Sequence, residues 1–233
     1  MPHPKSFTLV AGVLLAACGG GEESNDHAAH HPGATGGGEH AGHHDFSDVE
    51  RFAALFDAPD RDEWQRPAEV VGLLELSEGQ VVADLGAGTG YFEPHLAAAV
   101  GESGQVLALD VEEAMVAHMR NRFEEAGLHN VEARAVSPDD PGLEPGSVDR
   151  ILIVDTWHHI EDRPAYARHL AAALRPGGFI LVVDFTEESP HGPPESMRLS
   201  PHQVSTELTH GGLSASTVEE TLPHQFVIRA AHP

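Results

Sequence analysis

The stretch VVADLGAGTGYF, residues 81–92, decides how the rest of this chain folds. Its opening run of valine and leucine is typical of a parallel strand that is covered on both faces. Glycine follows at three alternate positions, and glycine lets the backbone turn sharply and approach a ligand closely. A helix that begins just beyond would point free N–H groups at that ligand. The stretch therefore predicts a strand, a ligand-binding turn and a helix.

Two classes of nucleotide-binding domain begin in this way. The dinucleotide fingerprint G-x-G-x-x-G requires its third glycine at position 91, which is Tyr91 in this chain. An acid, Asp84, also lies inside the strand, and D-x-G-x-G-x-G at a strand end resembles motif I of the class I S-adenosylmethionine (SAM)-dependent methyltransferases. In that family the acid contacts the methionyl end of SAM, and the glycines pass under the cofactor. The resemblance implies SAM-binding roles for Asp84, Gly86, Ala87, Gly88 and Gly90. A structural turn in another α/β protein, or an oxidoreductase, are the weaker alternatives.

Further SAM contacts are expected downstream. Asp110 ends the next predicted strand, about 20 residues beyond the glycine turn, where a carboxylate accepts hydrogen bonds from ribose hydroxyls. In the family this acid holds the SAM ribose, and side chains just after it pack near the adenine. The resemblance therefore implies Val111 and Met115 as cofactor neighbours, whereas a helix cap is the alternative role for Asp110. Family members usually place another acid against the adenine amino group, and Asp139 is preferred over Asp140 for this role.

The remaining pattern alternates strands and helices. Apolar runs predict strands at 105–109, 131–135, 150–155 and 179–184, and amphipathic runs predict helices at 92–100, 113–126 and 164–174. Two short runs, 214–222 and 225–231, predict a closing hairpin. The resemblance covers residues 64–231 and implies an α/β, Rossmann-like class I methyltransferase fold. We expect a central, mostly parallel seven-stranded sheet with an antiparallel C-terminal hairpin and helices on both faces, forming one domain over 48–233.

Candidate catalytic residues follow the fourth predicted strand. Ligands of open parallel sheets bind beyond the carboxyl ends of the strands, so this strand should end beside the SAM methyl group. Asp155, His158 and His159 lie there, and histidine titrates near neutrality, as a general base requires. His158 is the preferred base. The alternative is that one histidine caps the next helix and the other packs under a lid, to which Trp64 is expected to belong unless it anchors the core.

The N-terminus predicts export. Lys5 precedes an apolar run at 7–17, which suits a signal-peptide core and is too short to span a bilayer. The run ends in LAAC, which resembles the lipobox of bacterial lipoproteins, where the cysteine is lipidated. Residues 1–17 are therefore interpreted as a lipoprotein signal peptide and Cys18 as the lipidation site. An uncleaved signal anchor, or a mis-assigned start codon before a cytoplasmic enzyme, is the alternative.

Residues 18–47 are rich in glycine and histidine and nearly lack apolar bulk, so we expect a flexible tether. Histidines at this density bind Zn or Cu weakly, although a solvated linker without any specific role is the simpler interpretation. The candidate metal ligands are His27, His30, His31, His40, His43 and His44.

Composition narrows the partners and the location. The chain has 233 residues and carries 37 acids against 13 Lys and Arg, a formal charge of −24, which repels nucleic acid and anionic lipid. We expect a SAM-dependent methyltransferase that acts as a monomer on a small-molecule acceptor and contacts the membrane only through its lipid anchor. The expected location is the bacterial envelope, facing the periplasm, with the outer membrane slightly favoured. A non-catalytic SAM- or metal-binding lipoprotein is the second hypothesis, because SAM is made in the cytoplasm.

Overall fold

The computed structural model describes residues 48–233. The predicted signal peptide, the lipidation site Cys18 and the six tether histidines lie outside the described residues. Among residues 48–233, no helix combines the length and the apolar composition that crossing a bilayer requires.

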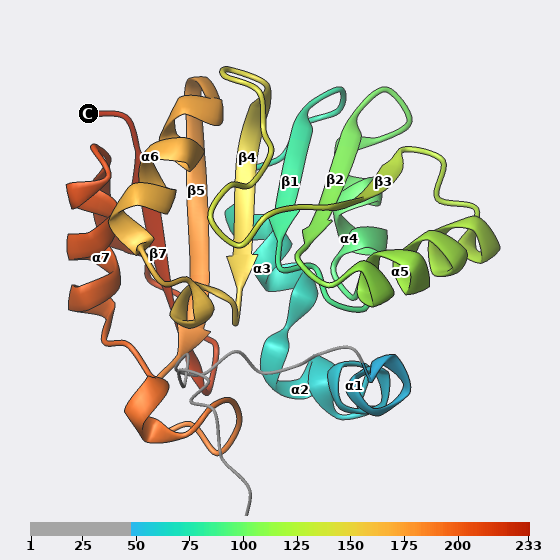
Figure 1. Cartoon of the computed structure of the whole chain (residues 1–233), viewed down its shortest axis with the longest axis horizontal. Coiled ribbons are helices and arrows are strands. Elements are labelled where there is room, and N and C mark those ends of the chain that lie inside the picture. The colour runs from blue at the N-terminus through green and yellow to red at the C-terminus, as the bar shows by residue number, and fades with distance from the viewer. Residues whose placement is uncertain (1–47) are drawn as a thin grey trace, which may run out of the picture. The chain divides into compact units, whose positions relative to one another are not determined.

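Within residues 48–233, seven strands form one sheet in the order β3-β2-β1-β4-β5-β7-β6 (Figure 1). The strands are β1 (Val81–Leu85), β2 (Gln105–Asp110), β3 (Val131–Ala135), β4 (Val148–Val154), β5 (Leu174–Phe185), β6 (Ser214–Thr217) and β7 (Gln225–Ala231). All neighbouring pairs are parallel except those of β7, which runs antiparallel to both β5 and β6. The predicted sheet and its closing hairpin are confirmed.

Helices cover both faces of this sheet. They are α1 (Val49–Phe56), α2 (Arg61–Gln65), α3 (Pro67–Leu73), α4 (Glu93–Val100), α5 (Glu113–Ala126), α6 (Arg163–Ala173) and α7 (Pro201–His210), with short 3-10 turns η1 (Trp157–His159) and η2 (Glu195–Met197). Successive residues of a strand point to opposite faces. Ile151 of β4 accordingly packs in one core with Leu170 of α6 and Leu208 of α7, whereas Leu152 packs in another with Leu96 of α4.

The start of β5 differs from the prediction. The strand was expected at 179–184, but the structure begins it at Leu174, the first residue of the turn LRPGG, and Leu174 pairs with Val148 of β4. Pairing resumes only between Phe179 and Arg150, so the four residues 175–178 loop out of the ladder. A Cβ at Gly178 would lie 2.9 Å from the Asp149 carbonyl oxygen, and glycine permits this close approach. The turn is thus a bulge within the strand.

The strand order places a switch point between β1 and β4. The chain leaves β3 at one edge of the sheet and re-enters as β4 on the other side of β1, so connections from these two central strands diverge. Such a divergence opens a crevice at the carboxyl ends of the strands. Figure 1 shows α1 and α2 below this end of the sheet.

Candidate cofactor and active site

The glycine turn is tied to the neighbouring strand β2. The N–H groups of Gly86 and Ala87 both donate to the Leu109 carbonyl oxygen, at 2.8 and 3.0 Å. The N–H of Gly88 donates to the Asp110 carboxylate at 2.8 Å. The structure therefore brings the predicted glycine turn and the predicted ribose acid into direct contact.

Glycine is required at both ends of the turn. Gly86 has a φ of +77° and Gly90 a φ of +81°, a region that favours glycine. A Cβ at Gly86 would overlap the side chain of Thr156 after β4, and a Cβ at Gly90 would lie 2.6 Å from the ring of Phe123 in α5. The turn is consequently packed tightly between the end of β4 and helix α5.

Asp110 combines burial with remaining capacity to accept hydrogen bonds. It is 8% exposed, and its second carboxylate oxygen accepts the Glu112 N–H at 2.9 Å. Burial raises the pKa of Asp110, and the backbone N–H donors oppose that shift. Each carboxylate oxygen accepts more than one hydrogen bond, so the Asp110 carboxylate can also accept hydrogen bonds from ribose hydroxyls. Of the other predicted neighbours, Val111 is 43% exposed beside Asp110, whereas Met115 is buried in α5.

The predicted adenine acid lies apart from these groups. Asp139 is exposed, and its carboxylate accepts a hydrogen bond from the Ser137 hydroxyl in the same loop. The residue of this loop that contacts the ribose acid is Val136, whose N–H donates to the Asp110 carbonyl at 3.0 Å. The role of Asp139 stays a prediction that no contact in the described part of the chain supports.

A second buried acid, Glu93, accompanies Asp84. Asp84 is 2% exposed and Glu93, at the start of α4, is fully buried. Burial raises the pKa of Asp84 to about 7, although the Arg61 guanidinium opposes the shift. Burial and the neighbouring Asp84 carboxylate raise the pKa of Glu93 well above its usual range. Glu93 was not predicted as a site residue, because a glutamate that opens a helix is ordinarily solvated.

Asp155, a predicted catalytic residue, has a strained backbone. Its φ is +53°, which is uncommon for an aspartate and typical of functional sites. Its carboxylate accepts a hydrogen bond from the Gln225 side chain at 2.6 Å, and Gln225 in turn accepts one from Gln65 of α2 at 2.8 Å. Burial raises the pKa of Asp155 to about 7, and the nearby Asp184 carboxylate adds to the shift.

The preferred base, His158, forms a buried pair with an acid that sequence reasoning missed. The Nδ1 atom of His158 lies 2.9 and 3.1 Å from the two carboxylate oxygens of Asp184 at the end of β5. Both side chains are at most 3% exposed. His159 is partly exposed, and its ring centroid lies 4.2 Å from that of His158. The only available signal for Asp184 was its place at the end of a predicted central strand.

Residues 48–66, which we call the cap segment, are hydrogen-bonded to residues of the glycine turn and its flank. Asp57 accepts hydrogen bonds from the Thr89 hydroxyl at 3.1 Å and from Arg122 of α5 at 2.9 Å. The Tyr91 hydroxyl donates to Asp62. Trp64 stacks on His191, with ring centroids 4.5 Å apart. Its other ring neighbour is Phe185 at the end of β5, with centroids 6.1 Å apart, and the place of Trp64 in a lid stays a prediction.

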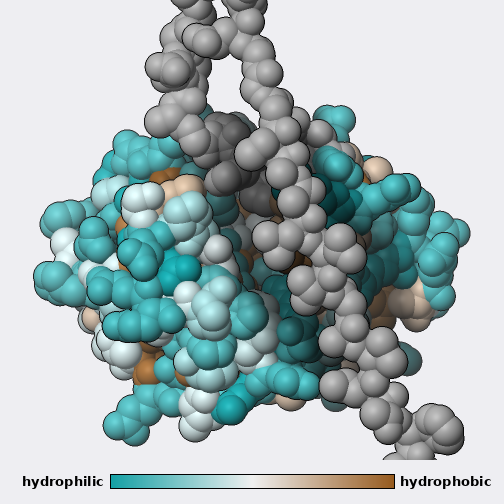
Figure 2. All heavy atoms as spheres, turned by 90° about the horizontal axis from the view of Figure 1, so that it is seen from below, coloured by the Kyte–Doolittle hydropathy of each residue, from teal (hydrophilic) through white to brown (hydrophobic). Residues whose placement is uncertain are grey.

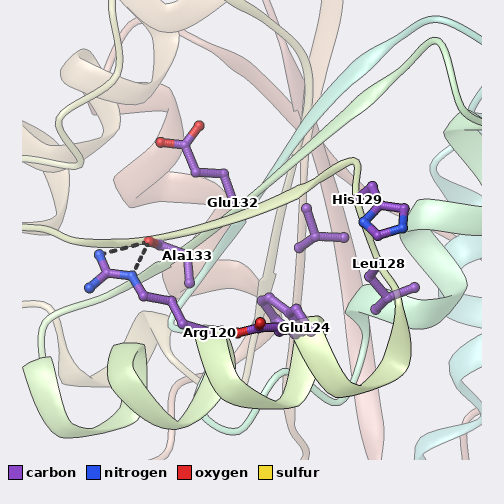
Figure 3. Close-up of a pocket in the computed structure, with 8 residues that line it drawn as sticks. Arg120, Glu124, Leu128, His129, Glu132 and Ala133 are labelled. Atoms are coloured by element: carbon purple, nitrogen blue, oxygen red, sulfur yellow. Dashed lines mark hydrogen bonds between the residues drawn. The ribbon is translucent and has the colours of Figure 1, made fainter.

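A separate groove lies at the outer edge of β3. Figure 3 shows Arg120 of α5 reaching Ala133 of the strand, while the Glu132 side chain points away from the helix, and Arg120 donates to the Ala133 carbonyl oxygen at 3.1 and 3.2 Å. Arginine thus covers an unpaired carbonyl of an edge strand. None of the predicted site residues lines this groove. Among residues 48–233 no cluster of three or more histidines, cysteines or acids is arranged to hold a metal ion.

The face that lies at the carboxyl ends of the strands is mainly hydrophilic where no grey atoms cover it (Figure 2). Hydrophobic residues appear there as small separate patches. This agrees with the excess of acids over basic residues in the sequence.

The strand order, the glycine turn after an acid in β1 and the second acid at the end of β2 define a class I SAM-dependent methyltransferase domain. Residues 82–178 match a protein family described as a methyltransferase domain. The ubiquinone/menaquinone biosynthesis C-methyltransferase UbiE of Escherichia coli O1:K1 / APEC is 30% identical over 113 residues, which cover 48% of this chain and 45% of that protein. The chain thus spans about half the length of the curated relatives it matches.

Solved structures agree with this class. A SAM-dependent methyltransferase from Aquifex aeolicus superposes with a TM-score of 0.74 and 29% identity, covering 81% of this chain and 98% of that one. Phosphoethanolamine N-methyltransferase 2 of Haemonchus contortus, in complex with SAM, shares the fold at 16% identity and a TM-score of 0.60, covering 73% and 53% of the two chains. The predicted enzyme class and the predicted cofactor, SAM, are confirmed for this domain.

The residues of the crevice fit SAM. The buried Asp110 carboxylate suits ribose hydroxyls, and the acids Asp84 and Glu93 suit the cationic methionyl end. A Cβ at Gly88 would lie 3.5 Å from the Phe56 ring, an ordinary contact distance, so α1 packs against this glycine. The assignment of each residue to a part of the cofactor stays a prediction.

Proposed function

We propose that this protein transfers a methyl group from SAM to a small-molecule acceptor and that His158 removes the acceptor's proton. The observation that carries the proposal is the buried His158–Asp184 pair at the carboxyl ends of β4 and β5. Strand β4 adjoins β1, whose glycine turn is assigned to the cofactor, and β5 lies on the other side of β4. A base at this edge of the sheet is placed for an acceptor that meets the methyl group there.

The geometry also sets the tautomer of the base. An ionised Asp184 carboxylate only accepts hydrogen bonds, so the Nδ1 atom of His158 donates to it. The other ring nitrogen, Nε2, then carries the free lone pair and is the atom that accepts a proton. SAM supplies the electrophilic methyl group when bound, while the chain orients the acceptor and holds its proton. Loss of a proton accompanies methylation of carbon as well as of oxygen acids, and the curated relatives are C-methyltransferases.

The test compares three variants with wild-type protein. Methyl-labelled SAM is incubated with pools of small phenols, quinols and amines, and the best acceptor is then used for kinetics. We expect His158→Ala to lower turnover by roughly 10²–10⁴-fold with little change in SAM affinity. Asp184→Asn should also lower turnover, because an amide can donate to Nδ1 and leave the proton on Nε2. His202→Ala, on the exposed side of α7, is the matched histidine control. Full turnover by His158→Ala would remove this residue as the base.

We propose further that the chain is a lipid-anchored envelope protein. The support is the order of features at its N-terminus, a charge at Lys5, an apolar run and small residues before Cys18. Cys18→Ser should leave an unprocessed precursor that incorporates no labelled fatty acid. If wild-type protein also incorporates none and fractionates with the cytosol, the lipoprotein interpretation is wrong.

A further inference from the structure

Arg61, in the cap segment, is a partly buried cation that forms no ion pair within residues 48–233. None of the ion pairs within residues 48–233 includes Arg61, and its Nε atom is buried without a hydrogen-bond partner in the same residues. Its terminal nitrogens donate to the Phe56 carbonyl and, at 3.4 Å, to the Gln65 side chain. A buried guanidinium ordinarily pairs with a carboxylate, often through two parallel hydrogen bonds. An anionic partner is therefore missing from this side chain.

The surroundings of Arg61 locate that partner at the cofactor crevice. Its guanidinium carbon lies 3.9 Å from the ring centroid of Tyr91, directly after the glycine turn. Burial lowers the pKa of Arg61, and the carboxylates of Asp155, Asp57 and Asp84 oppose the shift. Arg61 thus lies near the ends of β4 and β1, within electrostatic reach of the acid that the motif assigns to the methionyl end of SAM.

We propose that the guanidinium of Arg61 binds the α-carboxylate of SAM. This inference rests on the assigned cofactor and not on the identity of the acceptor. The methionyl end of SAM carries one carboxylate and one ammonium group, which call for a cation and an anion side by side. Arg61 supplies the cation, and the buried carboxyl of Asp84, beside Glu93, supplies the anion. Since Arg61 belongs to the cap segment, this contact also ties the cap to the bound cofactor.

The experiment measures binding by calorimetry with two ligands, SAM and decarboxylated SAM, in which hydrogen replaces the carboxylate. Wild-type protein should bind SAM more tightly than decarboxylated SAM. Arg61→Gln should lose about 10- to 100-fold in affinity for SAM and change little toward decarboxylated SAM, because only the charge-assisted contact is removed. Arg61→Lys, which keeps the charge but not the planar fork, should recover part of the loss.

Arg122→Gln is the matched control, because Arg122 latches the cap through Asp57 at 2.9 Å and is not assigned to the carboxylate. It should weaken the two ligands by the same factor. The proposal fails if Arg61→Gln also weakens both ligands equally, since that shows a role in holding the cap, and it fails if neither affinity changes. Equal affinity of wild-type protein for both ligands would overturn it as well. If wild-type protein binds neither ligand, the cofactor assignment fails, and this result is distinct from the others.

Discussion

Asp155→Asn should make the protein more stable at alkaline pH while leaving its stability near pH 4 unchanged. In the unfolded chain this carboxyl loses its proton near its ordinary pKa of 3.8, whereas in the folded protein burial keeps the proton until about pH 7. Between these values the folded state binds more protons than the unfolded state, so the free energy of unfolding falls as the pH rises. The destabilisation is complete above pH 7 and absent below pH 4.

The size of the effect follows from the two pKa values. They differ by about three, and each pKa unit corresponds to about 1.4 kcal/mol, which gives a ceiling of about 4 kcal/mol at pH 8. Asparagine carries no charge, its side-chain oxygen still accepts the hydrogen bond from Gln225, and it tolerates a φ of +53°. We therefore expect a gain of about 1–4 kcal/mol at pH 8.

Urea unfolding of wild-type and variant protein at pH 4.5 and pH 8, followed by circular dichroism, measures this difference. Asp139→Asn is the control, because Asp139 is exposed and the Ser137 hydroxyl lowers its pKa, so the variant should gain nothing at pH 8. Asp84 also has a raised pKa, but it is present in both proteins and its contribution cancels. A gain for Asp155→Asn that is equal at both pH values would refute the linkage argument.

Three further outcomes are expected. Asp110→Ala should weaken SAM binding by about 10- to 150-fold in calorimetry, because charge-assisted bonds to ribose hydroxyls are lost, and unchanged affinity would reject the assignment. Gly90→Ala should lower the free energy of unfolding by about 2–4 kcal/mol, since its Cβ would lie 2.6 Å from Phe123, whereas Gly127→Ala, with nothing within 4 Å, should cost about 1 kcal/mol. Deleting residues 20–45 should abolish weak Zn or Cu binding and preserve SAM affinity. Metal affinity that persists after the deletion would show that the metal site lies within residues 48–233.

The strands and the glycine turn were predictable because their signals are local. Apolar runs between turns predict strands. The start of α7 has a local signal too, a capping box formed by Ser200 and Gln203, and both of its reciprocal hydrogen bonds are present in the structure. The start of β5 was missed because Leu174 joins the sheet through a bulge that depends on its pairing with Val148. Bulges are set by the neighbouring strand, which a local pattern does not reveal.

A site residue was predictable only where its own position, in a motif or at a strand end, indicated its role. Asp84, Asp110 and His158 follow strand ends or a motif, so their place at the crevice could be expected. The roles of Asp184 and Arg61 depend on residues that are distant in the sequence. Asp184 contacts His158, and Arg61 contacts the ring of Tyr91. Burial of such groups depends on tertiary packing, and no spacing of residue types along the chain encodes it.

The distribution of charge explains why the fold tolerates so many buried acids at one place. Asp84, Glu93 and Asp155 come from β1, α4 and the end of β4, and burial raises the pKa of each, so each is less costly as a neutral side chain. Their cost at neutral pH is offset when a ligand brings positive charge, and SAM brings a sulfonium and an ammonium group. A ligand that binds only the folded state adds its binding free energy to the free energy of unfolding. The acids that lower the free energy of unfolding of the free protein are thus the ones that favour binding of the cationic cofactor. Arg61 is the proposed partner of its single carboxylate.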